Sequence, residues 1–549
     1  MMLRKTLASV LLCSSLLIPG CKQKSEDRMM VHEGAPGSTA TDKPQEEYAR
    51  DRGVAMGAGS GAPVNGAYAP SAKTDTTTAE GYQDYGKNPW VDASKDHLST
   101  FAADVDTASY SLARRKLLEG QLPVAAGVRV EEFVNYFRYA FPTPQSDSPF
   151  SVIMDAAPSP LAPGRHIVRV AVATKAKSAQ ERKPANLVFL VDVSGSMQSP
   201  DKLELAKKAL TTLTMNLGEG DTVALVTYAG STRVVLPPTG AANKSKIIAA
   251  LNDLVASGST GMASGIDLAY KQAMQGVRPG AISRVIVLSD GDANVGANTH
   301  EEILKIIEGR AKEGVTLSTI GFGTGNYKDA LMEQLADKGN GNYAYLDTLA
   351  EGRKVLVEQA GGTLVTVAKD VKLQVEFNPA QVAAYRLIGY ENRVLAAKDF
   401  NDDKKDAGDL GAGHTVTALY ELVPAGGTAE IAPVNPLKYQ KQPQLAPTAA
   451  SGEMCTVKLR YKEPESARSR LIEIPVRDSS ASYSQASGDF KFAAAVASFG
   501  MLLRGSKYAG TASADAVLEL AQEGVGNDVG GYRTEFLDLV RKSKTLAAR

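Results

Sequence analysis

Short apolar runs alternate with amphipathic segments through the middle of the chain. The apolar runs cover residues 186–191, 222–228, 285–288, 317–322 and 343–346, and segments with helical spacing lie near 203–217, 264–274 and 300–311. Strands that alternate with helices are typical of a parallel sheet covered by helices. We therefore predict a doubly wound, Rossmann-like α/β domain over residues 185–365.

The segments on both sides of this domain have the alternation or β-branched composition of strands. Such runs lie at 150–154 and 166–173 before it, and at 371–377, 415–422, 456–461 and 471–476 after it. Because the two ends of a compact domain often lie close together, one domain is readily inserted into another. The pattern predicts a β-sandwich built from residues 150–184 and 366–480, with the α/β domain inserted in it.

Helical spacing marks both ends of the folded part. It occurs at 108–119 and 129–137, and again at 490–503, 514–522 and 532–542. We expect a small N-terminal helical region over 87–149 and a C-terminal helical region over 486–549. The predicted fold class is a multidomain protein, in which an α/β domain is inserted in a β-sandwich with helical regions at both ends.

The first residues have the layout of a secretory signal peptide. Arg4 and Lys5 precede an apolar run over 7–18, and small residues follow. The sequence Ile-Pro-Gly-Cys at 18–21 resembles the bacterial lipobox, in which the signal is cut before a cysteine that receives acyl chains. The resemblance implies that residues 1–20 are removed and that Cys21 carries a lipid anchor. In an ordinary secreted protein, the alternative, Cys21 would be incidental.

The region after Cys21 predicts a tether in the cell envelope. Residues 22–86 are rich in Gly, Ala, Ser, Thr, Pro and charge, a composition that buries too little apolar surface to fold. A coil of about sixty-five residues has an end-to-end distance on the order of 45 Å. The absence of Asp after Cys21 favours, in the resembling lipoproteins, the outer membrane, facing the periplasm or the exterior.

Charge, cysteine content and missing motifs exclude several function classes. Lysine plus arginine number 61, as do aspartate plus glutamate, so no overall field attracts nucleic acid. Outside the signal, only Cys21 and Cys455 remain, which leaves no pair for a disulfide if Cys21 is acylated. The chain has no GxxxxGK[ST] phosphate loop and no GxSxG nucleophile elbow.

Oxygen-bearing side chains follow two of the predicted strands and precede one helix. Asp192, Ser194 and Ser196 follow the run 186–191, Asp290 follows the run 285–288, and Thr260 lies in a Gly-rich loop before the helical segment 264–274. Ligands of such folds bind at the carboxyl edge of the sheet. Two carboxylates and three hydroxyls suit a hard cation such as Mg²⁺ or Mn²⁺, whereas zinc prefers His or Cys.

This arrangement of Asp-Val-Ser-Gly-Ser, a loop threonine and Ser-Asp-Gly resembles the metal-ion-dependent adhesion site of von Willebrand factor A (VWA) domains. The resemblance implies that Asp192, Ser194, Ser196, Thr260 and Asp290 hold the cation, and that a partner protein's Asp or Glu carboxylate completes its coordination. The motifs FAADVDTASY at 101–110 and VEEFVNYF at 130–137 further resemble the YfbK-like bacterial lipoproteins, which have a central VWA domain and a family-specific C-terminal domain. The implied function is non-enzymatic protein binding.

Two other functions stay open at this point. The same cation could activate water in a metal-dependent hydrolase, although no general base or positively charged clamp is recognisable. Alternatively, the cation could only stabilise the fold while the flanking domains bind partners.

Two further patterns have structural interpretations. We interpret Asp106 or Thr107 as a helix cap, and the alternating Lys and Glu of residues 202–208 as a solvated helix face.

Overall fold

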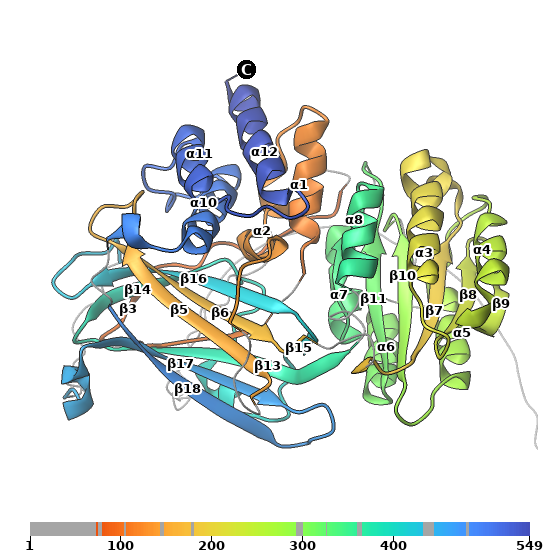
Figure 1. Ribbon diagram of the computed structural model, residues 1–549, viewed down its shortest axis with the longest axis horizontal. Helices are drawn as coiled ribbons and strands as arrows, with labels where there is room; N and C mark the ends of the chain where they lie inside the picture. Colours follow the sequence, from red (N-terminus) through yellow and green to blue (C-terminus); the bar gives the residue numbers. More distant parts are fainter. Residues whose placement is uncertain are drawn as a thin grey trace, which may run out of the picture. The chain divides into compact units, whose positions relative to one another are not determined.

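The computed structural model describes residues 73–74, 80–103, 106–142, 148–176, 181–291, 300–325, 327–359, 365–431, 444–478 and 482–548. The predicted signal peptide, Cys21 and most of the predicted tether lie outside these residues. The described chain forms an α/β domain, two antiparallel sheets and a cluster of helices (Figure 1). This is the predicted fold class.

The α/β domain contains a six-stranded sheet in the order β12-β11-β10-β7-β8-β9. All neighbouring pairs are parallel except β8 and β9, which are antiparallel. The strands are β7 (Ala185–Asp192), β8 (Thr222–Tyr228), β9 (Thr232–Gly240), β10 (Ile282–Ser289), β11 (Val315–Gly321) and β12 (Tyr343–Tyr345). The central strands β7 and β10 are buried along almost their whole length, which explains their unbroken apolar sequence.

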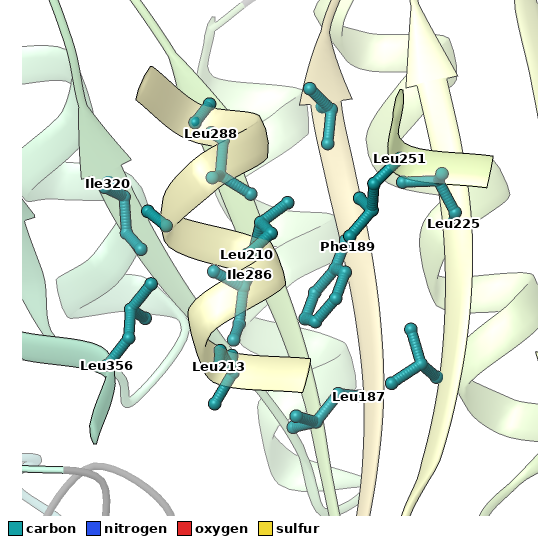
Figure 2. Close-up of a cluster of buried hydrophobic side chains, with 14 of the residues drawn as sticks. Leu187, Phe189, Leu210, Leu213, Leu225, Leu251, Ile286, Leu288, Ile320 and Leu356 are labelled. Atoms are coloured by element: carbon teal, nitrogen blue, oxygen red, sulfur yellow. The ribbon is translucent and has the colours of Figure 1, made fainter. Parts of the chain in front are cut away.

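Helices cover both faces of this sheet. One face packs on α3 (Leu205–Met215), α4 (Lys244–Asn252) and the segment that contains α8 (Leu349–Arg353) and the turn Lys354–Glu358. Figure 2 shows this layer, in which Phe189 of β7 lies among leucines and isoleucines from neighbouring strands and from α3. The other face packs on α5 (Met262–Gln275), α6 (His300–Lys312) and α7 (Asp329–Lys338).

Two antiparallel sheets enclose a second apolar core. One contains β4 (Leu98–Ala102), β13 (Thr366–Phe377), β15 (Gly408–Gly411), β17 (Glu453–Lys462) and β18 (Ser469–Arg477). The other has the order β3-β14-β16-β6-β5, with β3 (Val91–Asp92), β14 (Val382–Ile388), β16 (Thr415–Pro424), β6 (His166–Thr174) and β5 (Phe150–Pro158). Because β6 precedes the α/β domain and its partner β16 follows it, the α/β domain is inserted in the sandwich.

The helices from both ends of the chain form one cluster with a common core. It contains α1 (Ala108–Leu118), α2 (Val130–Tyr136), α10 (Gly488–Leu503), α11 (Ala514–Glu523) and α12 (Tyr532–Ala547). Figure 1 shows α1 beside α12, and Lys542 of α12 donates to the carbonyl of Leu118 at 3.1 Å. Helix α10 is apolar on nearly all sides because it lies at the centre of this cluster. In the part of the chain that the structure describes, no helix has the length and apolarity needed to cross a membrane.

The N-terminal boundary of the fold differs from the prediction in two ways. The expected helical region over 87–149 also supplies β3 and β4, which pair with β14 and β13 of the sandwich. The expected tether to residue 86 is wrong at its end, because Glu80 and Tyr82 are buried and β2 (Gln83–Asp84) pairs with β1 (Lys73–Thr74). Tyr82 packs with Leu112 of α1 and Tyr327, so this segment belongs to the fold.

Candidate functional site

The candidate site lies at the carboxyl edge of the parallel sheet, where the strand order reverses. Strand β7 has β8 on one side and β10, which comes later in the chain, on the other. Leu288 pairs with Val191, so Ser289 and Asp192 end these two strands side by side. Ligands of open α/β sheets bind at such a switch point, because the loops from the two strands diverge there.

The loop after β7 fixes the first carboxylate and two hydroxyls. Asp192 is fully buried, and its Oδ1 accepts a hydrogen bond from the backbone nitrogen of Ser194 at 2.9 Å. Its Oδ2 accepts from the hydroxyl of Ser289 at 3.0 Å. The Oγ atoms of Ser194 and Ser196 lie 2.9 Å apart. The structure thus brings these three predicted residues together, with the carboxylate held by its own loop and by the neighbouring strand β10.

The loop that contains Thr260 is bound to the same segment. The backbone nitrogen of Ser257 donates to the carbonyl of Val193 at 2.7 Å, and that of Gly195 donates to the carbonyl of Gly258 at 2.9 Å. Gly258 has φ of +85°, a left-handed conformation that favours glycine. Thr260 follows two residues later and is half-buried. The backbone therefore places Thr260 at the edge of the sheet that carries Asp192.

Two buried carboxylates dominate the electrostatics of the site. Asp290, directly after β10, is as fully buried as Asp192. Burial raises the pKa of Asp192 above its usual range, and the charge of Asp290 adds to this rise, while hydrogen bonds from Ser194 oppose it. Burial and the charge of Asp192 also raise the pKa of Tyr228. A cation bound between the carboxylates would stabilise their charged forms.

The donor chemistry of these residues fits a small hard cation. Two carboxylates and three hydroxyls offer oxygen alone, which is the ligand set of Mg²⁺ or Mn²⁺. Among the described residues, no group of three or more His, Cys, Asp or Glu side chains is arranged to hold a metal ion. A cation at this edge would therefore depend on the hydroxyls of Ser194, Ser196 and Thr260 as well as on the carboxylates.

Sequence reasoning missed Lys202, which contacts this site. Its Nζ donates to Oδ2 of Asp290 at 2.9 Å and to the carbonyl of Ser196 at 3.0 Å. Only 8% of Lys202 is exposed, so interpreting it as part of a solvated helix face was wrong. The cause is the π-helical turn Pro200–Glu204, which begins immediately after the site loop and turns this side chain inward. The nearby Pro200 was the one available signal of a helix start.

The second carboxylate pattern, around Asp106, lies elsewhere and does not cap a helix. Thr107 occupies the N-cap position of α1 without a side-chain cap bond. Asp106 instead accepts from the backbone nitrogen of Tyr343 at 2.8 Å and pairs with Arg393 at 3.2 Å. Tyr343 begins β12, the outermost strand of the sheet, which is separated from β7 by β11 and β10. Asp106 therefore connects three parts of the fold, whereas residues 104 and 105 lie outside the described chain.

Comparisons with known proteins agree with this architecture. A family model described as von Willebrand factor type A domain matches residues 186–358. One described as uncharacterized protein YfbK, C-terminal, matches residues 362–546, and one described as von Willebrand factor matches residues 76–169. The chain is 42% identical over 466 residues to the uncharacterized protein YfbK of Escherichia coli strain K12. The aligned region covers 84% of this chain and 80% of that protein. The chain belongs to the YfbK family.

More distant similarities are confined to part of the chain or to the fold. The uncharacterized protein sll0103 of Synechocystis sp. is 29% identical over 184 residues, which is 34% of this YfbK-family chain and 43% of that protein. A solved structure of a von Willebrand factor type A protein from Catenulispora acidiphila aligns with 74% of this chain and 91% of its own, at 17% identity and a TM-score of 0.40. In this YfbK-family protein, the VWA domain carries the candidate site.

Proposed function

We propose that this protein binds a divalent cation, Mg²⁺ or Mn²⁺, at the edge of its VWA domain and uses it to bind a partner protein. Asp192, Ser194, Ser196, Thr260 and Asp290 would hold the cation. The cation would supply a positive centre with room for one further oxygen ligand, which an Asp or Glu carboxylate of the partner provides. The protein acts as a binding module, with neither a catalytic step nor a nucleic-acid partner.

One observation carries this proposal: two fully buried carboxylates lie beside hydroxyls at one sheet edge. Burying a charge is costly unless an opposite charge compensates it. Lys202 compensates one of the two carboxylates, through Asp290. Asp192 has hydrogen bonds from Ser194 and Ser289, and a bound cation would compensate its remaining negative charge.

We further propose that the protein is attached to the cell envelope by acyl chains on Cys21, in the outer membrane. This rests on the sequence of the signal and lipobox. Because the folded part extends back to Glu80, the tether would be somewhat shorter than residues 22–86. Cys21→Ser should abolish incorporation of a labelled fatty acid and release the protein from the membrane fraction. Unchanged labelling in this variant would disprove the anchor.

The cation is tested by isothermal titration of the full chain with Mn²⁺ and Mg²⁺, beside Asp192→Ala. Saturable binding to the wild type and none to the variant is the expected result. Asp267→Ala is a matched control, because Asp267 is a half-exposed carboxylate on α5 that pairs with Lys271 at 2.6 Å. The control should bind the cation like the wild type.

Partner binding is tested by capture from envelope extract on the immobilised full chain. Proteins retained with Mn²⁺ should be released by a chelator and should not be retained by Asp192→Ala. Retention that neither change affects would place partner binding outside the cation site. Failure of the wild type to bind either cation would refute the proposal altogether.

A further inference from the structure

Lys202 is built into the candidate site as a buried counter-charge. Its ammonium group lies 2.9 Å from Asp290 Oδ2, and the two side chains are 10% and 1% exposed. Its second contact is to the backbone carbonyl of Ser196, on the loop that carries the two serine hydroxyls. Lys202 therefore connects two of the three segments that form the site, and its positive charge lies at their junction.

The neighbouring loop is shaped to receive this lysine. Gly323 has φ of +72°, and a Cβ atom at this position would lie 2.1 Å from Cε of Lys202. Only glycine leaves the side chain its path to Asp290. The hydroxyl of Tyr345 donates to the carbonyl of Gly323 at 2.6 Å, which holds the loop in place. Lys202 is thus packed closely against Gly323 in the interior.

Helix α1 contacts the residues beside Lys202 and Gly323 from outside the VWA domain. Arg115 donates from Nη1 to the hydroxyl of Tyr345 at 3.0 Å and from Nη2 to Oδ2 of Asp201 at 2.6 Å. Asp201 precedes Lys202, and Tyr345 holds Gly323 through a hydrogen bond. Arg115 therefore contacts the neighbours of both Lys202 and Gly323. The position of Lys202 therefore depends on the docked N-terminal helix as well as on its own turn.

This arrangement changes the charge that an entering cation meets. Asp192 and Asp290 carry two negative charges when both are ionised, and the ammonium group of Lys202 offsets one of them. The ammonium group of Lys202 also repels the entering divalent cation, and it occupies Oδ2 of Asp290 with a hydrogen bond. Both effects oppose cation binding, while a cation once bound keeps more of its positive charge for an acidic ligand.

We propose that Lys202 is a positioning residue that lowers the affinity of this site for divalent cations. The inference rests on the proposed function, because it concerns the same cation. It predicts that a neutral side chain at this position gives a tighter cation site, by about tenfold or more.

The test is isothermal titration of the full chain with Mn²⁺ alone, comparing wild type, Lys202→Met and Lys202→Gln. Glutamine keeps a hydrogen-bond donor toward Asp290 without the charge, so it remains informative if the methionine variant folds poorly. Lys207→Met is the control: this lysine lies further along the same segment and contacts Glu204 at 2.8 Å and the carbonyl of Leu254 at 3.1 Å. Melting temperatures with Mn²⁺ and with chelator provide a second measurement.

Tighter Mn²⁺ binding in both Lys202 variants, with a larger stabilisation by Mn²⁺ than in wild type and an unchanged control, would support the inference. Binding by the variants alone would also support it, since the lysine would then exclude the cation from the wild type. Equal or weaker binding in the variants, with binding intact in wild type, would overturn the inference and leave the proposed function standing. No binding in any of these proteins would overturn both.

Discussion

Arg129 is one of the buried arginines at the contact between the helical cluster and the VWA domain, and replacing it should destabilise the protein. Arg129, which precedes α2, donates to both oxygens of Asp329 on α7, at 2.5 and 3.2 Å. Its Nε donates to Glu132, and Glu333 lies 3.8 Å from Nη1. Arg129→Met would remove the positive charge shared by three carboxylates and keep most of the aliphatic volume.

The expected cost follows from the burial of this cluster. The side chain of Arg129 is 6% exposed, and those of Asp329 and Glu132 are 1% exposed, so water screens these charges little. Removing one partner of a buried pair typically costs about 3–5 kcal/mol, because the remaining charge keeps its desolvation penalty. Asp329→Asn leaves Arg129 its contacts with Glu132 and Glu333 and should cost less, about 1–2 kcal/mol.

Urea unfolding followed by the fluorescence of Trp90, the single tryptophan, measures the loss. Hydrogen exchange of α2 and α7 locates it. Arg310→Met is the control, because Arg310 pairs with Glu313 on the surface at 35% and 49% exposure and should cost less than about 0.5 kcal/mol. An Arg129→Met protein as stable as this control, with α7 equally protected, would refute the reasoning.

Two further substitutions test the buried carboxylate of α2 and the core of the VWA domain. Burial and the charges of Glu391 and Glu132 raise the pKa of Glu131 from 4.5 to about 8, so the folded protein retains a proton that the unfolded chain releases. The protonated Glu131 therefore contributes stability that is lost as pH rises from 4.5 to 8, by up to about 5 kcal/mol. Glu131→Gln cannot titrate, so its melting temperature should fall less over that pH range than that of the wild type. An identical pH dependence of the two melting temperatures would contradict this prediction. Phe189→Ala should lower the free energy of unfolding in urea by about 3–5 kcal/mol, because this ring is fully buried at the centre of the layer in Figure 2. A loss below about 1 kcal/mol would contradict this prediction and show that the core collapses around the cavity.

The strands of the VWA domain were predictable from sequence where both faces of the strand are buried. Strands β7, β8 and β10 are nearly continuous apolar runs, and their predicted positions match the structure within a few residues. The sequence analysis missed β9, whose sequence TRVVLPPTG contains two prolines and has several exposed positions. It lies at the edge of the sheet, where proline is tolerated because one side needs no hydrogen-bond donor.

The short strand β4, whose partner is distant in sequence, escaped the sequence analysis. Strand β4 has the short and partly polar sequence LSTFA, and it is a strand only because Leu98 to Ala102 pair with residues 372–376 of β13. Likewise, the two helical regions were expected at opposite ends of the chain and form a single core. Local periodicity identifies such elements individually, but it contains no information about which of them meet.

The candidate ligands and Lys202 differ in how the sequence encodes them. Asp192 and Asp290 directly follow apolar strands, so their place at the sheet edge follows from the parallel arrangement. Lys202 reaches the same edge only through the direction of a π-helical turn and the space that Gly323 leaves. Both features depend on tertiary packing, and an alternating Lys and Glu pattern predicts the opposite, solvated position.

The true start of the fold bears on every experiment at this site. Glu80 Oε1 accepts from the backbone nitrogen of Gly325 at 2.7 Å and pairs with Lys116 of α1 at 2.9 Å. Gly81 donates to the carbonyl of Tyr327 at 3.0 Å, and Lys328 in turn packs tightly against the residue after Asp290. A chain that began at residue 87, the start expected from sequence, would lose these contacts beside the site. Loss of cation binding in such a truncated chain would therefore reflect the missing segment as much as the site, which is why the titrations require the full chain.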